Sequence, residues 1–191
     1  MQPITPETTA ADHDRLVAVL RERSVRRQRV LLASGRESDF YVDCRATTLH
    51  PEGAALVARL LLARLQPDLA GVGGPVTGAD PITGATVALS HLAGRPLMGF
   101  MVRKEPKGHG LKLWVEGRGN LQDGDKVCIV EDTVTTGGSL LRAIEHVEAS
   151  GLVVAQVVVV VDREEGARER IAEAGYDMEA LVGRAELLGE G

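Results

Sequence analysis

One stretch of the sequence decides the expected fold: VCIVEDTVTTGGSLL, Val127–Leu141. Its first four residues are apolar and rich in β-branched side chains, which is typical of a short strand buried on both faces of a sheet. Apolar residues then return at helical spacing, at Leu140, Ile144 and Val147. Gly151 is a suitable C-terminal stop for that helix. The stretch therefore predicts a strand, an acidic pair, a Thr/Gly turn and the start of a helix.

The chain beyond about residue 66 continues this alternation of strands and helices. Strands are expected at residues 69–73, 96–102, 127–130 and 153–161, helices at 78–93 and 165–174 besides the one after the Thr/Gly turn, and then a short tail. A polar segment is expected between the strand that ends at Val102 and about Asp125. This order predicts an α/β fold with a mostly parallel sheet and helices on both faces.

The first 65 residues do not fit the alternation. Helices are expected at Thr9–Arg27 and Pro51–Leu65, with two short strands around the turn Ser34–Arg36 between them. We interpret this part as a small N-terminal cap. The whole chain is then a single domain with a cap at residues 1–65 and a parallel α/β core at 66–191.

The composition excludes several classes of protein. With 44% hydrophobic and 26% charged residues, the chain has the make-up of a globular protein, and no apolar run approaches the length of a membrane span. The net charge of −5 argues against a general nucleic-acid binder, which would be basic. The N-terminus is too polar for a signal peptide. Cys44 and Cys128 lie far apart and outside any metal-binding pattern, so we expect free thiols in the cytoplasm.

Four segments follow the predicted strands at their carboxyl ends, which is where open parallel sheets bind ligands. They are GGPVTGADP (73–81), RKEPKGHG (103–110), EDTVTTGG (131–138) and the pair Asp162–Arg163. Their convergence on one edge of the sheet predicts a single binding site there.

The segment EDTVTTGG combines two kinds of polar group. Backbone N–H groups and hydroxyls from Thr135 to Ser139, together with the helix dipole, favour a phosphate. Glu131 and Asp132 would repel a phosphate, but their oxygens accept hydrogen bonds from a vicinal diol. A phosphate and a diol on one molecule describe a ribose 5-phosphate. The alternative is an ordinary strand–helix turn whose acidic pair only favours the helix N-terminus.

The segment RKEPKGHG holds four potential cations, namely Arg103, Lys104, Lys107 and His109. Such a loop could close over a polyanionic leaving group such as pyrophosphate and stabilise its charge; the alternative is a solvated surface loop. Arg163 either pairs at the surface or contacts a planar carboxylate or imide. Tyr41, next to Phe40, could pack on a planar base or belong to the core.

VCIVEDTVTTGG resembles the 5-phosphoribosyl-1-diphosphate signature of the phosphoribosyltransferases. SGRESDFYVDCR, GADPI, RKEPKGHG and VVDREEG are similar to the orotate phosphoribosyltransferase family, and the similarity spans roughly Leu31 to Gly166. This resemblance implies a type I phosphoribosyltransferase fold. It also implies transfer of a phosphoribosyl group to orotate in pyrimidine synthesis, with Mg²⁺, by a cytoplasmic homodimer with shared active sites. A purine phosphoribosyltransferase would not need RKEPKGHG and Arg163 together, and a regulatory protein that only binds the diphosphate should lack the cationic loop.

The resemblance also implies a role for each matching residue. Glu131 and Asp132 would bind the ribose hydroxyls, directly or through Mg²⁺ that the protein alone does not hold tightly. The 5-phosphate would lie on the turn formed by Thr133, Val134, Thr135, Thr136, Gly137, Gly138 and Ser139. Diphosphate contacts would come from Arg103, Lys104, Lys107 and His109, of which the last three would be catalytic together with Asp132. Orotate would contact Thr135, Arg163, Tyr41 and Val42. Some family members carry lysines where this chain has Ala33 and Gly78, so what replaces their contacts is open.

Overall fold

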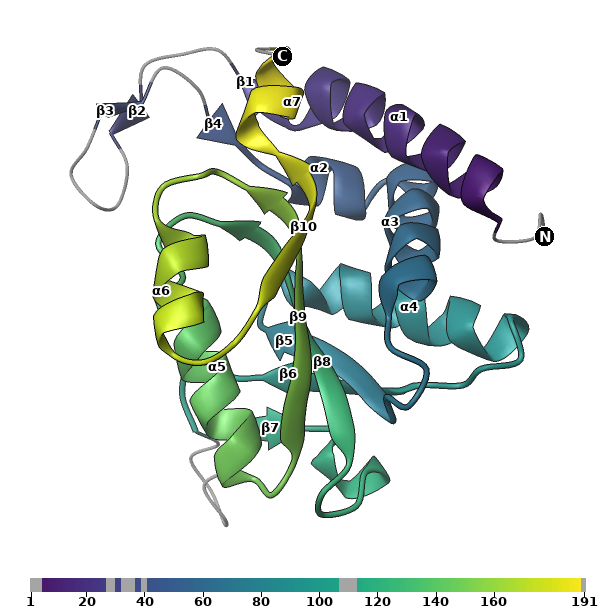
Figure 1. Ribbon diagram of the computed structural model, residues 1–191, viewed down its shortest axis with the longest axis vertical. Coiled ribbons are helices and arrows are strands. Elements are labelled where there is room, and N and C mark those ends of the chain that lie inside the picture. The colour runs from purple at the N-terminus through teal and green to yellow at the C-terminus, as the bar shows by residue number, and fades with distance from the viewer. Residues whose placement is uncertain (1–4, 27–29, 32–36, 39–40, 107–112, 190–191) are drawn as a thin grey trace.

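A six-stranded sheet forms the centre of the computed structural model, which describes residues 5–26, 30–31, 37–38, 41–106 and 113–189 (Figure 1). The strands lie in the order β10-β9-β8-β5-β6-β7. Their bounds are β5 Gly71–Pro75, β6 Met98–Val102, β7 Val115–Glu116, β8 Lys126–Val134, β9 Val153–Asp162 and β10 Met178–Gly183. All neighbours are parallel except β7, which pairs antiparallel with β6. The predicted mostly parallel α/β fold is confirmed.

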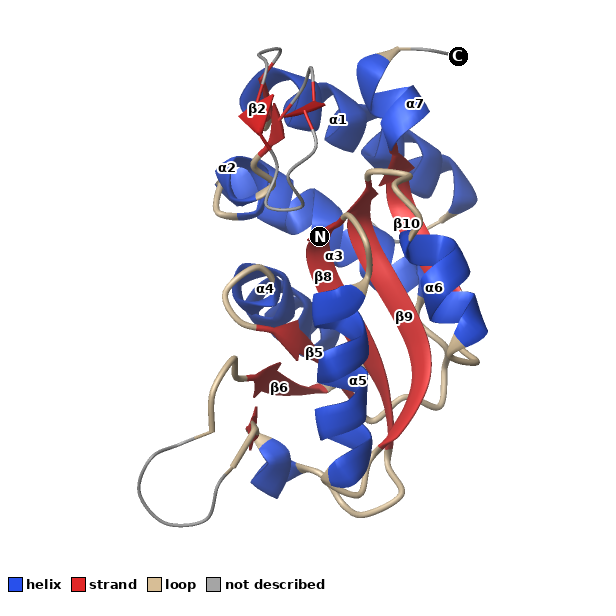
Figure 2. Ribbon diagram, turned by 90° about the vertical axis from the view of Figure 1, so that its left-hand side faces the viewer, coloured by secondary structure: helices blue, strands red, loops and turns tan. Residues whose placement is uncertain are grey.

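Helices cover both faces of this sheet. Figure 1 shows α3 (Pro51–Arg64) and α4 (Ala79–Leu92) on one side and α5 (Gly138–Ala149) and α6 (Ala167–Glu173) on the other. Figure 2 looks onto the face that α5 and α6 cover. Alternate valines of β9 pack into two hydrophobic clusters, Val158 and Val160 in the one that holds α3, Val157 and Val159 in the one that holds α5. Burial on both faces explains why this strand is a nearly unbroken run of valine.

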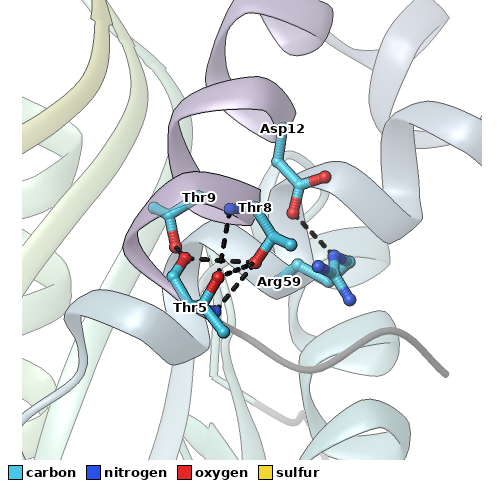
Figure 3. Close-up of polar contacts among 5 residues, drawn as sticks. All are labelled: Thr5, Thr8, Thr9, Asp12 and Arg59. Atoms are coloured by element: carbon cyan, nitrogen blue, oxygen red, sulfur yellow. Dashed lines mark hydrogen bonds and ion pairs between the residues drawn. The ribbon is translucent and has the colours of Figure 1, made fainter.

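In the N-terminal part of the chain, helix α1 (Pro6–Arg23) packs against α3. Thr5 and Thr8 cap its first turn: Thr8 N donates to Thr5 Oγ1 at 3.3 Å, and Thr5 N donates to Thr8 Oγ1 at 2.8 Å (Figure 3). This capping box starts the helix three residues before the expected Thr9. An ion pair of 2.7 Å between Arg59 and Asp12 links α1 to α3 (Figure 3).

Two short antiparallel sheets follow α1. They are formed by β1 (Val25–Arg26) with β4 (Tyr41–Val42), and by β2 (Val30–Leu31) with β3 (Glu37–Ser38). The short helix α2 (Arg45–Thr48) then leads to α3. The expected turn Ser34–Arg36 lies outside the described residues. Apolar side chains of α1 and α3 share one hydrophobic cluster with side chains of the sheet. The division into a cap at residues 1–65 and a core from residue 66 stays a prediction.

The structure corrects the end of one expected strand and adds elements to the polar segment and to the tail. Strand β8 does not end at Val130 but continues through the acidic pair, because Glu131 and Thr133 pair with Val159 and Val161 of β9. The polar segment before Asp125 contains β7 and a 3₁₀ turn at Arg118–Asn120. The short tail forms β10 and the helix α7 (Arg184–Leu188). Arg21 of α1 holds α7 by donating to the Leu187 carbonyl oxygen at 3.1 Å. None of the described helices is long and apolar enough to cross a lipid bilayer.

Two glycines provide a matched test of this packing. A Cβ on Gly74, in the central strand β5, would overlap the carbonyl oxygen of Val130, whereas a Cβ on Gly84, in α4, has nothing within 4 Å. We expect Gly84→Ala to raise the free energy of unfolding by about 0.5–1 kcal/mol, because alanine favours helix. Gly74→Ala should lower it by about 1–3 kcal/mol or more, because the strands must separate. Urea unfolding midpoints measure both. Equal changes would show that β5 is not packed as described.

Candidate functional site

A cavity of about 530 Å³ opens at the carboxyl ends of β5, β6 and β8. Its wall is formed by residues 41–45, 75–78, 102–104 and 131–133, by Trp114, and by Ser139, Arg142, Ala143 and His146 of α5. Three of the four predicted segments therefore meet at one edge of the sheet, as the parallel topology requires. The fourth, Asp162–Arg163, does not line this cavity.

The two carboxylates lie at the end of β8, beside the start of α4. Glu131 is 7% exposed, and Thr133 N donates to Asp132 Oδ1 at 2.7 Å. A Cβ on Gly78 would lie 2.5 Å from Asp132 Oδ1 and 2.6 Å from Glu131 Oε1. With the two side chains in these positions the backbone passes close to both carboxylates, so a larger residue such as lysine at position 78 would require their oxygens to move.

Burial changes the protonation of the pair. It raises the pKa of Glu131 from the ordinary 4.5 to about 8, with the Asp132 charge as a second cause. Burial also raises the pKa of Asp132, although the backbone hydrogen bond from Thr133 opposes this shift. Near neutral pH the ligand-free pair thus keeps a proton, which a cation or a bound ligand can displace.

Carboxylate oxygens are suitable ligands for Mg²⁺, so Glu131 and Asp132 fit this metal. The described residues contain no group of three or more His, Cys, Asp or Glu side chains that could hold an ion. Mg²⁺ commonly binds through one or two carboxylates together with water and substrate phosphates. The pair could therefore hold Mg²⁺ only with oxygens supplied by a ligand.

The turn after β8 borders a second, solvent-open hollow of about 410 Å³. Gly137 has φ +75°, a conformation that favours glycine, and it places Gly138 at the start of α5. The hollow is lined by Thr133, Thr135, Thr136, Gly137, Gly138 and Ser139, and also by Arg142 of α5 and Arg170 of α6. Val134 is buried and faces the core. The structure thus adds two guanidinium groups to the predicted phosphate turn.

Neither arginine was predicted from the sequence. Arg142 lies three residues after Ser139 on the same helix, a spacing that puts both on one face, so this signal could have been found. Arg170 comes from a separate helix, and only the packing of α6 beside the turn brings it there.

The structure places two of the four predicted loop cations at the cavity wall. Arg103 N donates to the Trp114 carbonyl oxygen at 2.9 Å, which joins the two ends of the loop. The Arg103 guanidinium pairs with Glu116 at 2.9 Å, and Lys104 is exposed beside it. Lys107 and His109 lie outside the described residues.

A stacked aromatic pair, also missed from the sequence, forms part of the same wall. The rings of Trp114 and His146 are 3.9 Å apart and nearly parallel, at 10°. Because Trp114 follows the cationic loop and His146 belongs to α5, the pair fixes the end of the loop to this helix.

The four predicted orotate contacts are separated. Tyr41 and Val42 line the larger cavity, and Thr135 lines the hollow. Arg163 lines neither: it is 4% exposed and pairs with Glu165 at 2.9 Å. Its contact with orotate stays a prediction. Ala33 and Arg36 lie outside the described residues.

Comparison with known proteins identifies the family. Residues 85–175 match the family described as Phosphoribosyl transferase domain. The chain is 45% identical to an orotate phosphoribosyltransferase of Bradyrhizobium diazoefficiens, over 94% of this chain and 97% of the relative. The chain belongs to the orotate phosphoribosyltransferases. A Sorangium cellulosum member of this family is also 45% identical, over 94% of each chain.

Solved structures of orotate phosphoribosyltransferases share the fold. The Mycobacterium tuberculosis enzyme in complex with Fe(III) dicitrate has a TM-score of 0.77 and 41% identity, covering 92% of this chain and 98% of that one. The same enzyme in complex with 5-phospho-α-D-ribosyl 1-diphosphate has a TM-score of 0.74 and 39% identity, with the same coverage. An adenine phosphoribosyltransferase of Leishmania tarentolae, at 20% identity and a TM-score of 0.59 over 79% of this chain and 80% of that one, shares the fold alone. The predicted type I phosphoribosyltransferase fold is confirmed.

The raised pKa of Glu131 predicts how stability depends on pH. The unfolded chain loses this proton near pH 4.5 and the folded chain near pH 8. Between these values the folded state binds more protons, so the free energy of unfolding should fall as the pH rises. Glu131→Gln has no such proton. Without Mg²⁺ or substrate, the free energy of unfolding of the variant should therefore depend less on pH in this window. At higher pH the variant should be more stable than the wild type. Identical pH profiles in urea unfolding would contradict the burial of this carboxylate.

Proposed function

We propose that the chain transfers the 5-phosphoribosyl group from 5-phosphoribosyl-1-diphosphate to orotate, giving orotidine 5′-monophosphate and diphosphate. One observation carries this proposal: a carboxylate pair, with Glu131 buried and Asp132 half-buried, is followed at the end of β8 by a Thr/Gly turn suited to an anion, in a chain 45% identical to orotate phosphoribosyltransferases over 94% of its length. The activity belongs to pyrimidine nucleotide synthesis.

Different residues bind different parts of the substrate. The turn at Thr133–Ser139 faces the 5-phosphate, and Glu131 and Asp132 accept hydrogen bonds from the ribose hydroxyls. As the bond from the anomeric carbon to the diphosphate breaks, positive charge develops on the ribosyl centre, which the orotate ring nitrogen then attacks. Arg103 and Lys104, at the wall of the cavity, neutralise the departing diphosphate. Catalysis then comes from positioning and charge stabilisation rather than from a protein nucleophile.

Mg²⁺ and a second subunit complete the proposal. The acidic pair supports binding of Mg²⁺ together with the ribose and the diphosphate, where the metal would neutralise phosphate charge. Lys107 and His109 are proposed to act in the active site of the neighbouring subunit of a homodimer. The free thiols of Cys44 and Cys128, both buried, support a reducing compartment such as the cytoplasm.

A nucleobase panel tests the activity. Purified protein, Mg²⁺ and 5-phosphoribosyl-1-diphosphate are mixed with orotate, uracil, adenine or hypoxanthine, and diphosphate release is followed. We expect turnover with orotate only, and Glu131→Gln/Asp132→Asn should remove most of it while the fold is kept. Turnover with a purine base and none with orotate would make the chain a purine phosphoribosyltransferase, and binding without turnover would make it a regulatory protein.

Subunit mixing tests the shared active site. Lys107→Ala and Glu131→Gln/Asp132→Asn homodimers should each be nearly inactive. After equal mixing and exchange, about half of the dimers are heterodimers, and in each of these one site carries both defects and the other none. About a quarter of wild-type activity should therefore return. With exchange verified by mass, no recovery would mean that Lys107 acts within its own subunit.

A further inference from the structure

We propose that Arg142 and Arg170 form a guanidinium pair that binds the 5-phosphate of the phosphoribosyl group and makes the enzyme selective for phosphorylated sugars. This inference rests on the proposed function and adds to it two binding residues on two different helices. Both side chains line the hollow at the Thr/Gly turn, and Arg142 also lines the larger cavity. Arg142 thus lies between the position expected for the phosphate and the position expected for the ribose.

The two guanidinium groups converge on one point of the turn. Measured from the position of a Cβ built on Gly138, Arg170 Nη1 lies at 3.4 Å and Arg142 Nη1 at 3.8 Å. Arg170 Nη1 also donates to the Thr136 carbonyl oxygen at 3.4 Å, which fixes α6 to the turn. The first backbone N–H groups of α5 also belong to this turn. An anion seated there would meet both side chains and the helix N-terminus together.

The charges around this point are unbalanced without a ligand. Within the described part of the chain, neither Arg142 nor Arg170 has a carboxylate within 4 Å, whereas other arginines of the same protein form ion pairs, such as Arg15 with Glu52 at 2.6 Å. Both arginines are exposed to solvent, and their like charges beside the turn favour an anion between them.

A phosphate monoester matches the pair in charge and in geometry. It carries about −1.5 to −2 charges at neutral pH, which two guanidinium groups balance. The backbone and hydroxyl donors of the turn supply hydrogen bonds but no charge, and Glu131 and Asp132 nearby add negative charge when ionised. Guanidinium groups bind phosphate through two parallel hydrogen bonds, which fixes its orientation as well.

The decisive probe is ribose 5-phosphate, compared with ribose, because it carries the 5-phosphate but neither a base nor a diphosphate. We expect Arg142→Gln and Arg170→Gln each to weaken ribose 5-phosphate binding about ten-fold, the effect of losing one charge-assisted contact. The affinity for orotidine 5′-monophosphate should fall by the same factor. The affinity for orotidine and the KM for orotate should stay unchanged. The salt dependence of binding should become shallower, and Arg170→Lys should recover most of the affinity, because it restores the charge. Arg15→Gln, which removes an exposed arginine of α1, is the matched control and should have no effect.

Calorimetry at two salt concentrations gives the affinities, and steady-state turnover gives the KM for orotate. If ribose 5-phosphate and orotidine 5′-monophosphate bind equally well to wild type and both variants, the pair does not bind the phosphate. If only 5-phosphoribosyl-1-diphosphate binding weakens, the pair contacts the diphosphate instead and the inference is wrong. If Arg170→Lys binds as weakly as Arg170→Gln, with an unchanged salt dependence, Arg170 only supports the turn. The ribose 5-phosphate measurement does not depend on the base, so a failure of the orotate assay alone would overturn the proposed function and leave this inference standing.

Discussion

The constraint on which the rest of the site depends is a pair of carboxylates at the end of a central strand, with Glu131 buried and Asp132 half-buried. Glu131 and Asp132 are held there because β8, which pairs with β5 as far as Ile129, continues past them to Val134 along β9. Gly78 leaves room for their oxygens. The cost of burying negative charge raises the pKa of both groups; under the proposed function, ribose hydroxyls and a cation would displace the proton that the pair keeps.

Under the proposed function, this constraint also separates the two halves of the substrate. The carboxylates lie in the larger cavity, and the turn that follows β8 points to the smaller hollow, where donors and arginines favour an anion. Arg142 borders both spaces. A sugar that carries a phosphate at one end and hydroxyls at the other can occupy them together, whereas a free base or a free phosphate can fill only one.

Much of the fold and of the site was predictable because local sequence signals agree with the final packing. The valine run of β9 and the helical spacing of Leu140, Ile144 and Val147 in α5 each correspond to buried positions. The signals failed where partners from distant parts of the chain decide the outcome. Charged residues after Val130 suggested a strand end, yet pairing with β9 carries β8 further. The edge strand β10 has a weak pattern, and the sequence did not show that Arg163 would be buried against Glu165 or that Arg170 would reach the turn.

The most direct test of the account is a crystal structure of the protein with 5-phosphoribosyl-1-diphosphate and Mg²⁺. The account predicts that the 5-phosphate lies on the Thr133–Ser139 turn and that oxygens of Glu131 and Asp132 lie within hydrogen-bond or metal-bridged distance of the ribose hydroxyls. The diphosphate should then point towards Arg103 and Lys104. A structure with the diphosphate on the turn, or with the ribose away from the two carboxylates, would contradict it.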